Sequence, residues 1–295
     1  MNTNGGNRAV TVTRTATGDL TGIDLYQNVL IARHEGVDPL AISHLTFDSV
    51  DDSDLFFTTA TSAPNTLTVY PNTELMVWNG KTFAPGGNVT LQSGGSGDSR
   101  DGRLYLGTSA VSSAAGTETH SVGGSLFAGT GSTFSPANTT LTFTATTTGK
   151  SIVSVPALTL YDVVFNGTGG NWSLDSTGTT TMNTLSVTAG TVSGTSSVLV
   201  QNSSVAGNGT IAMTGGAFRI DGTGIFGGSS PWTFYHLMFG SGAAASSTNT
   251  GSATTTVSRV LTMAAGYTLN AGSSAYMLPG SGTPFLMNGT FRGMG

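Results

Sequence analysis

The sequence predicts an all-β protein built as a parallel β-solenoid, a column of stacked coils with roughly 20–25 residues in each. Three observations predict this class: apolar and polar residues alternate along short segments, turn signals interrupt those segments, and similar phrases recur. The chain has 295 residues with 43 glycines, and only 8% of its residues are charged. An ordinary soluble domain has about 25% charged residues. Because the helix formers Glu, Lys and Gln are scarce, long helices are not expected.

Alternation of period two is clearest in the segment TLTFTATTTG at 140–149. Leu141, Phe143 and Ala145 alternate there with threonines, and TVTRTATG at 11–18 repeats the pattern with Thr at every second position. Such alternation indicates a strand with one buried and one polar side. The segment GIDLYQNVLIARHEG at 22–36 has no clean stripe, and it is compatible with a short helix or with a strand.

Two phrases recur along the chain. The first occurs as ISHLTFDS at 42–49, LYDVVFNG at 160–167 and FYHLMFGS at 234–241. The second occurs as LTVYPNTEL at 67–75, LSVTAGTVS at 185–193 and LTMAAGYTL at 261–269. The phenylalanine of the first phrase (Phe47, Phe165, Phe239) is followed at a nearly constant distance by the leucine that opens the second. This gap is about 20 residues in every copy, which is typical of one solenoid coil.

These spacings predict stacked coils whose inward Phe and Leu form ladders. At about 22 residues a coil the chain would form roughly 13 coils, a rod on the order of 60 Å long. The longer spacing from Phe165 to Phe239 then corresponds to about three coils, and the copies would place Asp162 and His236 in one side-chain row. A string of immunoglobulin-like sandwiches is the alternative, although the chain lacks the cysteines that such domains usually carry.

The charged residues suggest a division of the chain. Seventeen of the 25 charged residues lie in 1–103. We therefore expect an N-terminal cap and first strands at 1–40, followed by the solenoid at 41–295. A loop insertion is expected near 92–104, and repeat groups are expected to start near 158 and 232.

The phrases FYHLMFGSG, LSVTAGTVSG, VGGSLFAGTGSTF (122–134) and LTFTATTTGKSIVSV (141–155) resemble the repeats of large bacterial cell-surface and secreted proteins. They are similar to adhesins and to autotransporter passenger domains, and the resemblance covers roughly residues 40–293. It implies a right-handed parallel β-helix displayed outside the cell. It implies no catalytic residues.

Composition narrows the expected partners. The formal charge is −5 with ten basic residues, which argues against nucleic acid as a partner. No apolar run approaches the length of a membrane helix, and there are no cysteines to form disulfides. The low charge suits an extracellular or cell-surface location. We expect a segment of a longer polypeptide that contacts polysaccharide or neighbouring surface proteins.

The acidic run DSVDDSD is the candidate metal site, because Asp48, Asp51, Asp52 and Asp54 could offer carboxylate oxygens to calcium. The alternative is a solvated turn, since the spacing of an EF-hand is missing. No other cofactor is expected. The segment GGSGDS at 94–99 resembles a calcium-binding nonapeptide, but it occurs once and its Asp98 falls one position early.

The favoured function is a non-catalytic stalk, adhesin or matrix component. Exposed aromatic residues could stack on sugars, but burial is the expected fate of Trp78, Trp172 and Trp232. The first alternative is a polysaccharide-degrading hydrolase or lyase, in which the acidic run would converge with Asp98 or Asp101. The second is an ice-binding solenoid, although Thr-x-Thr, seen at 11–17 and 142–146, does not recur in each coil.

Overall fold

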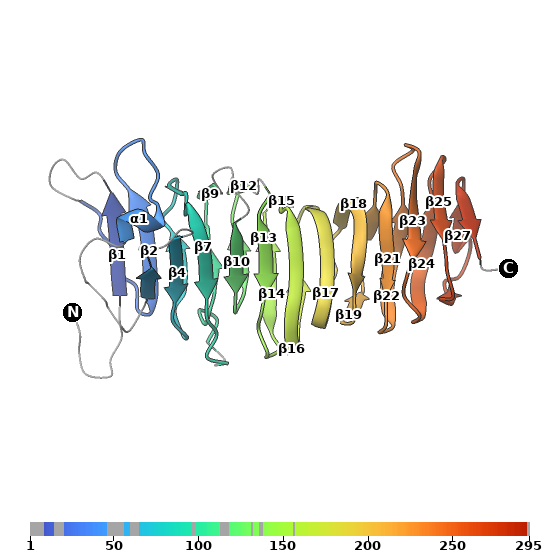
Figure 1. The fold of residues 1–295 in the computed structure, drawn as a ribbon, viewed down its shortest axis with the longest axis horizontal. Helices are drawn as coiled ribbons and strands as arrows, with labels where there is room; N and C mark the ends of the chain where they lie inside the picture. The colour runs from blue at the N-terminus through green and yellow to red at the C-terminus, as the bar shows by residue number, and fades with distance from the viewer. Residues whose placement is uncertain are drawn as a thin grey trace.

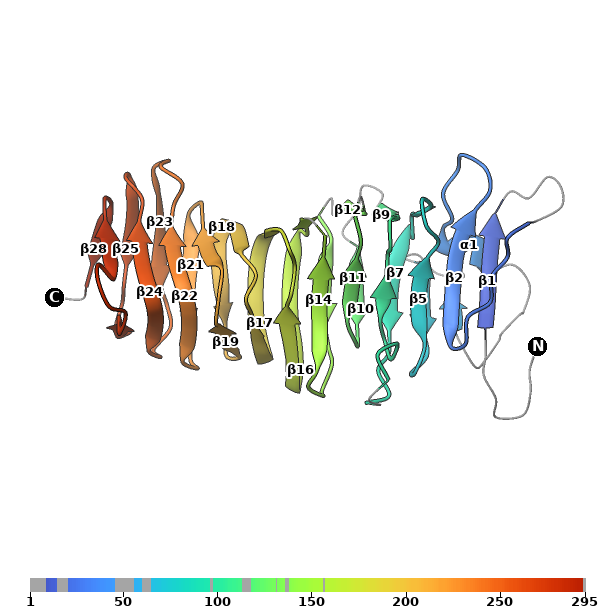
Figure 2. The ribbon, with the colours of Figure 1, turned by 180° about the vertical axis from the view of Figure 1, so that it is seen from behind.

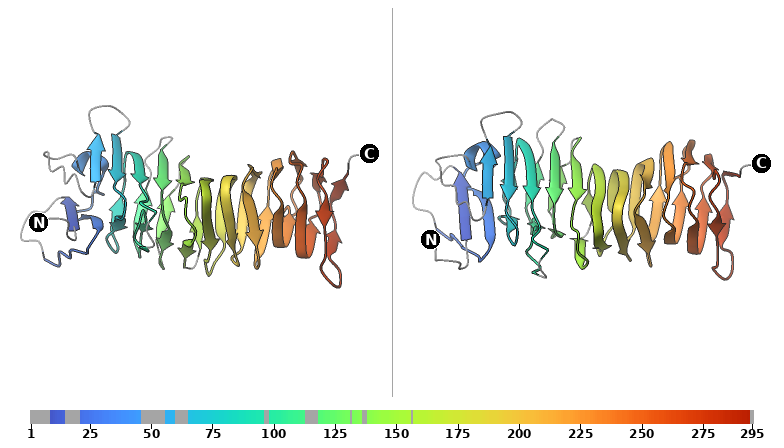
Figure 3. Two further views of the ribbon diagram at one scale, coloured as in Figure 1. Left: turned by 90° about the horizontal axis from the view of Figure 1, so that it is seen from below. Right: turned by 60° about the horizontal axis from the view of Figure 1, so that its bottom comes forward.

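The chain forms a single β-solenoid of about 11 coils, with 2% helix and about 22 residues in each coil. In the computed structural model the described residues are 9–14, 21–45, 56–59, 65–95, 98–112, 118–130, 132–135, 138–155 and 157–293. The coils stack along one long axis, with strands β1 (Ala9–Arg14) and β28 (Thr290–Arg292) near opposite ends of the column (Figure 1). Views from behind and from below show the same continuous column (Figures 2 and 3).

Each coil has three sides, which we call face 1, face 2 and face 3 in the order in which the chain visits them. Strands of neighbouring coils pair in parallel on every face, so the backbone groups of one coil bond to the next. Face 1 holds β1 (Ala9–Arg14), β2 (Val29–His34), β5 (Glu74–Val77), β8 (Leu104–Tyr105), β11 (Leu126–Ala128), β14 (Lys150–Ser154), β19 (Thr210–Met213) and β26 (Tyr276–Met277).

The other two faces are built in the same way. Face 2 holds β6 (Thr82–Phe83), β9 (Ala110–Ser112), β12 (Thr133–Ser135), β15 (Leu158–Thr159), β20 (Ala217–Ile220) and β27 (Phe285–Met287). Face 3 holds β4 (Asn65–Val69), β7 (Gly87–Leu91), β10 (Thr119–Val122), β13 (Thr140–Phe143), β21 (Gly224–Gly228), β23 (Ala245–Asn249), β25 (Tyr267–Asn270) and β28 (Thr290–Arg292), and β3 (Phe56–Thr59) joins β4 in an antiparallel pair.

Five longer strands bend around corners and belong to more than one face. They are β16 (Asp162–Leu174), β17 (Thr180–Gly194), β18 (Val198–Gly207), β22 (Trp232–Phe239) and β24 (Thr255–Met263). In β17, for example, 180–182 pairs on face 2, 184–187 on face 3 and 191–194 on face 1.

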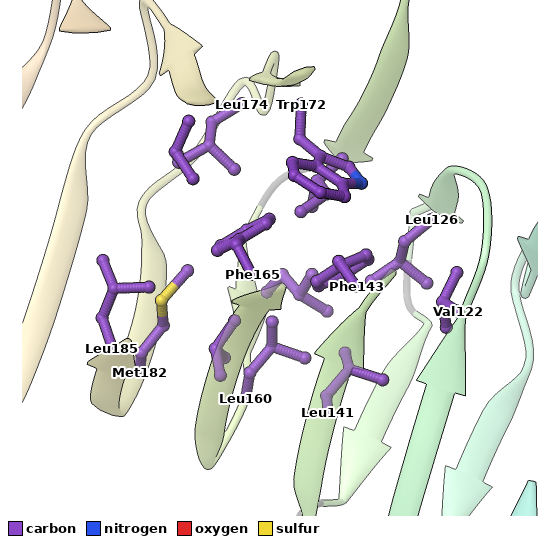
Figure 4. Close-up of a cluster of buried hydrophobic side chains, with 14 of the residues drawn as sticks. Val122, Leu126, Leu141, Phe143, Leu160, Phe165, Trp172, Leu174, Met182 and Leu185 are labelled. Atoms are coloured by element: carbon purple, nitrogen blue, oxygen red, sulfur yellow. The ribbon is translucent and has the colours of Figure 1, made fainter. Parts of the chain in front are cut away.

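The core is a set of inward ladders that run the length of the column. On face 1 one ladder consists of Leu30, Leu75, Leu104, Leu126, Ile152 and Leu174, each paired with the next. All six side chains are at most 5% exposed, and they belong to one continuous apolar cluster. Figure 4 shows side chains from different faces meeting in the centre of the column. Because one coil cannot cover its own apolar side, stacking is what makes this core.

The number of coils is smaller than the 13 expected, because the coils near the N-terminus are longer than average. Leu30 and Leu75 pair on neighbouring coils although the chain between them contains a helical turn at 42–45 and the strands β3 and β4. The next coil is also long. Leu75 pairs with Leu104, and Glu74 and Arg103, the residues just before them, are 29 residues apart in sequence. The expected division of the chain near residue 40 stays a prediction.

The recurring phrases do not mark equivalent positions in the coil, which corrects the sequence interpretation. Phe165 lies on face 3, between Phe143 and Val187. Phe239 lies on face 2, between Ile220 and Met263. The sequence between the two phenylalanines is therefore not a whole number of coils. The phrase is typical of any short strand whose residues alternate between buried and outward positions. All three faces contain such strands, so the phrase does not identify one face.

The first copy of the phrase differs further. Residues Ile42–Leu45 form α1, a single helical turn whose Ile42 and Leu45 are buried. Phe47 lies outside the described residues. The ambiguous segment at 22–36 contains strand β2, with no helix. No helix in the described ranges is long and apolar enough to span a bilayer.

Candidate functional site

The outward side of face 3 carries two rows of small, mostly polar side chains, which we call the hydroxyl face. Within each strand the two side chains stand two residues apart, so they project from the same side of the sheet. The first row consists of Thr66, Asn88, Thr119, Thr140, Asp162, Thr184 and Ser204. The second row consists of Thr68, Thr90, Ser121, Thr142, Val164, Ser186 and Ala206.

The hydroxyl face combines regular spacing with very little charge. Neighbouring coils bring equivalent side chains to about 4.8 Å along the column, and the two rows lie about 7 Å apart. Thr119 is exposed and the other side chains of both rows are half-buried. Asp162 is the one charged member of the two rows, and its Oδ1 accepts hydrogen bonds from Asn183 Nδ2 at 2.9 Å and Thr184 Oγ1 at 2.6 Å.

Sequence reasoning missed this surface. Thr-x-Thr at 66–68 and 140–142 lies in the two rows, but the coils between them carry variants such as Asn-Val-Thr and Thr-His-Ser. The segment at 11–14 lies on face 1, in β1. Because 31 residues separate Asn88 from Thr119 and 22 separate Asp162 from Thr184, a fixed sequence period does not find the rows. A comparison of outward positions, strand by strand, would have found them.

The candidate calcium ligands Asp48, Asp51, Asp52 and Asp54 lie outside the described residues, so the calcium site stays a prediction. The same holds for an acidic cleft formed by that run with Asp98 or Asp101. Within the described ranges no group of three His, Asp or Glu side chains is arranged to hold a metal ion.

Asp98 and Asp101 both accept hydrogen bonds that stabilise the loop between β7 and β8. Asp98 Oδ1 accepts a hydrogen bond from the Arg100 amide at 2.9 Å. Asp101 is buried, and its carboxylate accepts bonds from the amides of Asn72 and Gly94, both at 2.8 Å, and from Ser93 Oγ at 2.6 Å. Burial alone would raise the pKa of Asp101, but these three donors, together with the positive charge of Lys150, outweigh it and the pKa is lowered. Asp101 therefore acts as an ionised brace for the loop.

Asp162 and His236 do not share a side-chain row, contrary to the sequence interpretation. Asp162 belongs to the hydroxyl face and pairs with Thr184, whereas His236 pairs with Val260 on face 2. Because the two residues project from different faces, they cannot act together as an acid–base pair.

Two of the three tryptophans are core residues, as expected. Trp172 and Trp232 are at most 1% exposed, and Trp232 Nε1 donates to the carbonyl of Gly209 at 3.0 Å. Trp78 is half-buried, and the Arg33 guanidinium lies 5.6 Å from its ring centroid. Trp172 and Trp232 are therefore not available to stack on a sugar.

Two pairs of neighbouring titratable side chains lie in or beside the core. Glu74 is buried and bonds to Arg103; burial raises the pKa of Glu74, and Arg103 only partly offsets this. His120 occupies an inward position on face 3 between Val89 and Leu141, with its Nε2 3.5 Å from Glu118 Oε2. The space beside His120 has a volume of about 10 Å³, room for roughly one water molecule. Because both side chains are buried beside so small a space, there is no room for a substrate next to them.

Comparison of the chain with protein-family models, with curated proteins and with solved structures finds no match. The fold and the chemistry of its surfaces therefore carry the functional argument.

Proposed function

We propose that this chain is a non-catalytic segment of a cell-surface or secreted protein, which serves as a stiff stalk, adhesin or matrix component and contacts polysaccharide. The continuous column supports the mechanical part of this proposal. Neighbouring coils bond to each other through parallel ladders, and one apolar cluster runs along them, in a chain without cysteine. The resemblance of the repeats to adhesins and autotransporter passengers supports the location.

The observation that carries the binding part is the hydroxyl face. Hydroxyl groups both donate and accept hydrogen bonds, and they match the hydroxyl groups of a neutral polysaccharide without the desolvation of a charge. The rows extend from Thr68 to Ala206 across seven neighbouring strands. Many weak contacts made at a regular spacing give a useful total affinity through multivalency. Neighbouring surface proteins are the other partner class that such a face could meet.

Co-sedimentation with insoluble cellulose and chitin tests this role. The informative variant is Thr142→Lys, which places a long charged side chain in the middle of the second row. The matched control is Thr262→Lys, because Thr262 is also half-buried and points outward, but from face 2. We expect the wild type and the control to sediment with at least one polysaccharide and Thr142→Lys to sediment several-fold less. Equal sedimentation of all three proteins would contradict a role for the hydroxyl face.

Release of reducing ends from the same polysaccharides provides a test of the enzymatic alternative. The proposal expects no release above that of a heat-denatured sample. Sustained release by the native protein would replace a binding role with a degrading one.

The same two rows also favour a second candidate function, ice binding. Regularly spaced threonine hydroxyls and methyl groups on a sheet can order water into an ice-like arrangement. Asp162 and Val164 interrupt both rows in a single coil, which favours polysaccharide over ice. Thermal hysteresis separates the two functions: a gap between melting and freezing points that Thr142→Lys abolishes would support ice binding.

A further inference from the structure

A groove opens at the corner between faces 3 and 1, where three consecutive coils turn with unequal lengths. Residues 92–103, of which 92–95 and 98–103 are described, join β7 to β8; residues 123–125 join β10 to β11, and residues 144–149 join β13 to β14. The middle corner is the shortest. Asp98, Ser99 and Arg103 line the groove on one side, and Thr148, Gly149 and Lys150 line it on the other; we call these two sets its first and second walls. The groove between them has a volume of about 300 Å³.

Glycine makes the short middle corner possible. A Cβ atom on Gly124 would lie 2.1 Å from the carbonyl oxygen of Asp101, and one on Gly123 would lie 2.6 Å from that of Leu91. Any larger residue would have to push the two corners apart. The first wall is itself held in place, because the buried carboxylate of Asp101 ties Ser93, Gly94 and Asn72 together. The groove is therefore formed before any ligand arrives.

The floor of the groove is apolar at one point. Phe127, on the outward side of β11, lines it together with Val153 of the next coil. The ring of Phe127 stacks on that of Tyr105, with centroids 4.7 Å apart and planes 7° apart. Because both rings are half-buried and point outward, they expose apolar ring surface that the core does not use.

Polar groups surround this apolar floor. Asp98 and Arg103 come from the first wall, Ser125 and Ser151 from the floor, and Lys150 from the second wall. Arg103 is already bonded to Glu74, and the positive charge of Lys150 helps to lower the pKa of Asp101. Both cations of the lining therefore have acidic neighbours already, so neither calls for an anionic ligand.

We propose that this groove is a subsite for one or two neutral hexose residues of a polysaccharide chain. A pyranose ring has an apolar C–H side and a rim of hydroxyls, which match the Phe127–Val153 floor and the polar side chains around it. The volume lies at the lower end of the range for small-ligand sites, about 300–1,000 Å³, which suits a short saccharide. The inference rests on the proposed contact with polysaccharide, but it concerns a different surface from the hydroxyl face.

Calorimetric titration of the full chain with soluble neutral oligosaccharides tests the subsite, with cellohexaose, chitohexaose and mannohexaose as probes. The first variant is Ser151→Leu, which removes a hydroxyl and fills the floor. Its matched control is Ser173→Leu, because Ser173 pairs with Ser151 in the same outward row but lies one coil beyond the groove. The second variant is Phe127→Ala, with a thermal melt to verify that it is folded.

We expect at least one probe to bind the wild type and Ser173→Leu with the same affinity. Affinity should fall about tenfold or more in Ser151→Leu, the size expected when a polar contact of a bound ligand is lost, and also in folded Phe127→Ala. Equal affinities for Ser151→Leu and Ser173→Leu would overturn the subsite. A wild type that sediments with polysaccharide but binds none of the probes would overturn the subsite alone, whereas a wild type that does neither would overturn the proposed function as well.

Discussion

The rings of Phe143 and Phe165 stack across two neighbouring coils, with centroids 4.9 Å apart and planes 13° apart. Trp172 reaches the same place from face 1, 5.1 Å from the Phe165 ring. Figure 4 shows these three side chains together in the middle of the core. This contact joins two coils and two faces, so it reports on the stacking that holds the column together.

Phe165→Ala should therefore destabilise the protein strongly. Removal of a fully buried phenylalanine typically lowers the free energy of unfolding by about 3–5 kcal/mol. Val164→Ala is the control, because Val164 is the preceding residue and points outward; an effect within about 1 kcal/mol is expected there. Urea unfolding followed by circular dichroism measures both. A Phe165→Ala effect no larger than that of the control would contradict the central place of this stack.

Two glycine substitutions should distinguish the cost of a steric clash from the cost of a left-handed backbone conformation. Gly124→Ala meets the backbone of the preceding coil, whereas Gly266→Ala meets nothing closer than 3.5 Å but has a φ of +78°. The left-handed conformation costs about 1–2 kcal/mol for a residue with a side chain. Gly124→Ala should cost more than this, because a backbone clash cannot relax through a rotamer change. Thermal melts of the two variants would reveal the order, and the reverse order would contradict the tight corner.

The lowered pKa of Asp101 predicts a loss of stability in acid. Its carboxylate is hydrogen-bonded only in the folded state, where the pKa lies below the unfolded value of about 3.9. The stabilisation is therefore present above that value, and it is lost as the pH falls through the folded-state pKa. Asp101→Asn should lower the free energy of unfolding by about 1–3 kcal/mol at pH 7. The difference from the wild type should shrink as the pH approaches 2; a constant difference between pH 7 and pH 2 would contradict the assignment.

The contribution of Glu74 to stability should depend on pH in the opposite direction to that of Asp101. Burial raises its pKa in the folded state, so the folded protein holds this proton more tightly than the unfolded chain does. The contribution to stability is then largest below the unfolded pKa, and it is lost as the pH rises through the folded-state value. Glu74→Gln keeps a hydrogen-bond acceptor for Arg103 and should remove this pH dependence. Unfolding of both proteins between pH 4 and pH 7 tests the sign, and a wild type that gains stability over this range relative to Glu74→Gln would contradict it.

The fold class and the length of a coil were predictable because they depend on local alternation and on mean spacing. Leu141 and Phe143 point inward and Thr142 points outward, as their alternation predicts. The equivalence of Phe165 and Phe239 was wrong, because strands on different faces share one alternating pattern. Which residues are equivalent depends on how the strands of neighbouring coils pair. Because the coils differ in length, equivalent residues have no fixed spacing in the sequence: Leu30 pairs with Leu75 although a helical turn and two strands lie between them.

The candidate surfaces were less predictable for the same reason. The hydroxyl face depends on which outward side chains lie side by side, and the groove depends on three corners of different length. Phe127 has the sequence context of an ordinary core residue in the phrase SLFAG, yet it points outward, because Leu126 and Ala128 occupy the inward positions. Neither surface follows from residue types alone.

Disulfide formation between cysteines placed in neighbouring coils tests the stacking register most directly, and the absence of natural cysteines leaves no competing thiol. Val164 and Ser186 are partners on the hydroxyl face, whereas Thr184 lies two positions before Ser186. A disulfide needs Cα atoms about 4.4–6.8 Å apart, which paired residues satisfy and residues displaced by two positions do not. We expect a rapid disulfide in Val164→Cys/Ser186→Cys and none in Val164→Cys/Thr184→Cys. A disulfide in the second protein, or in neither, would contradict the stacked register on which the hydroxyl face and the groove depend.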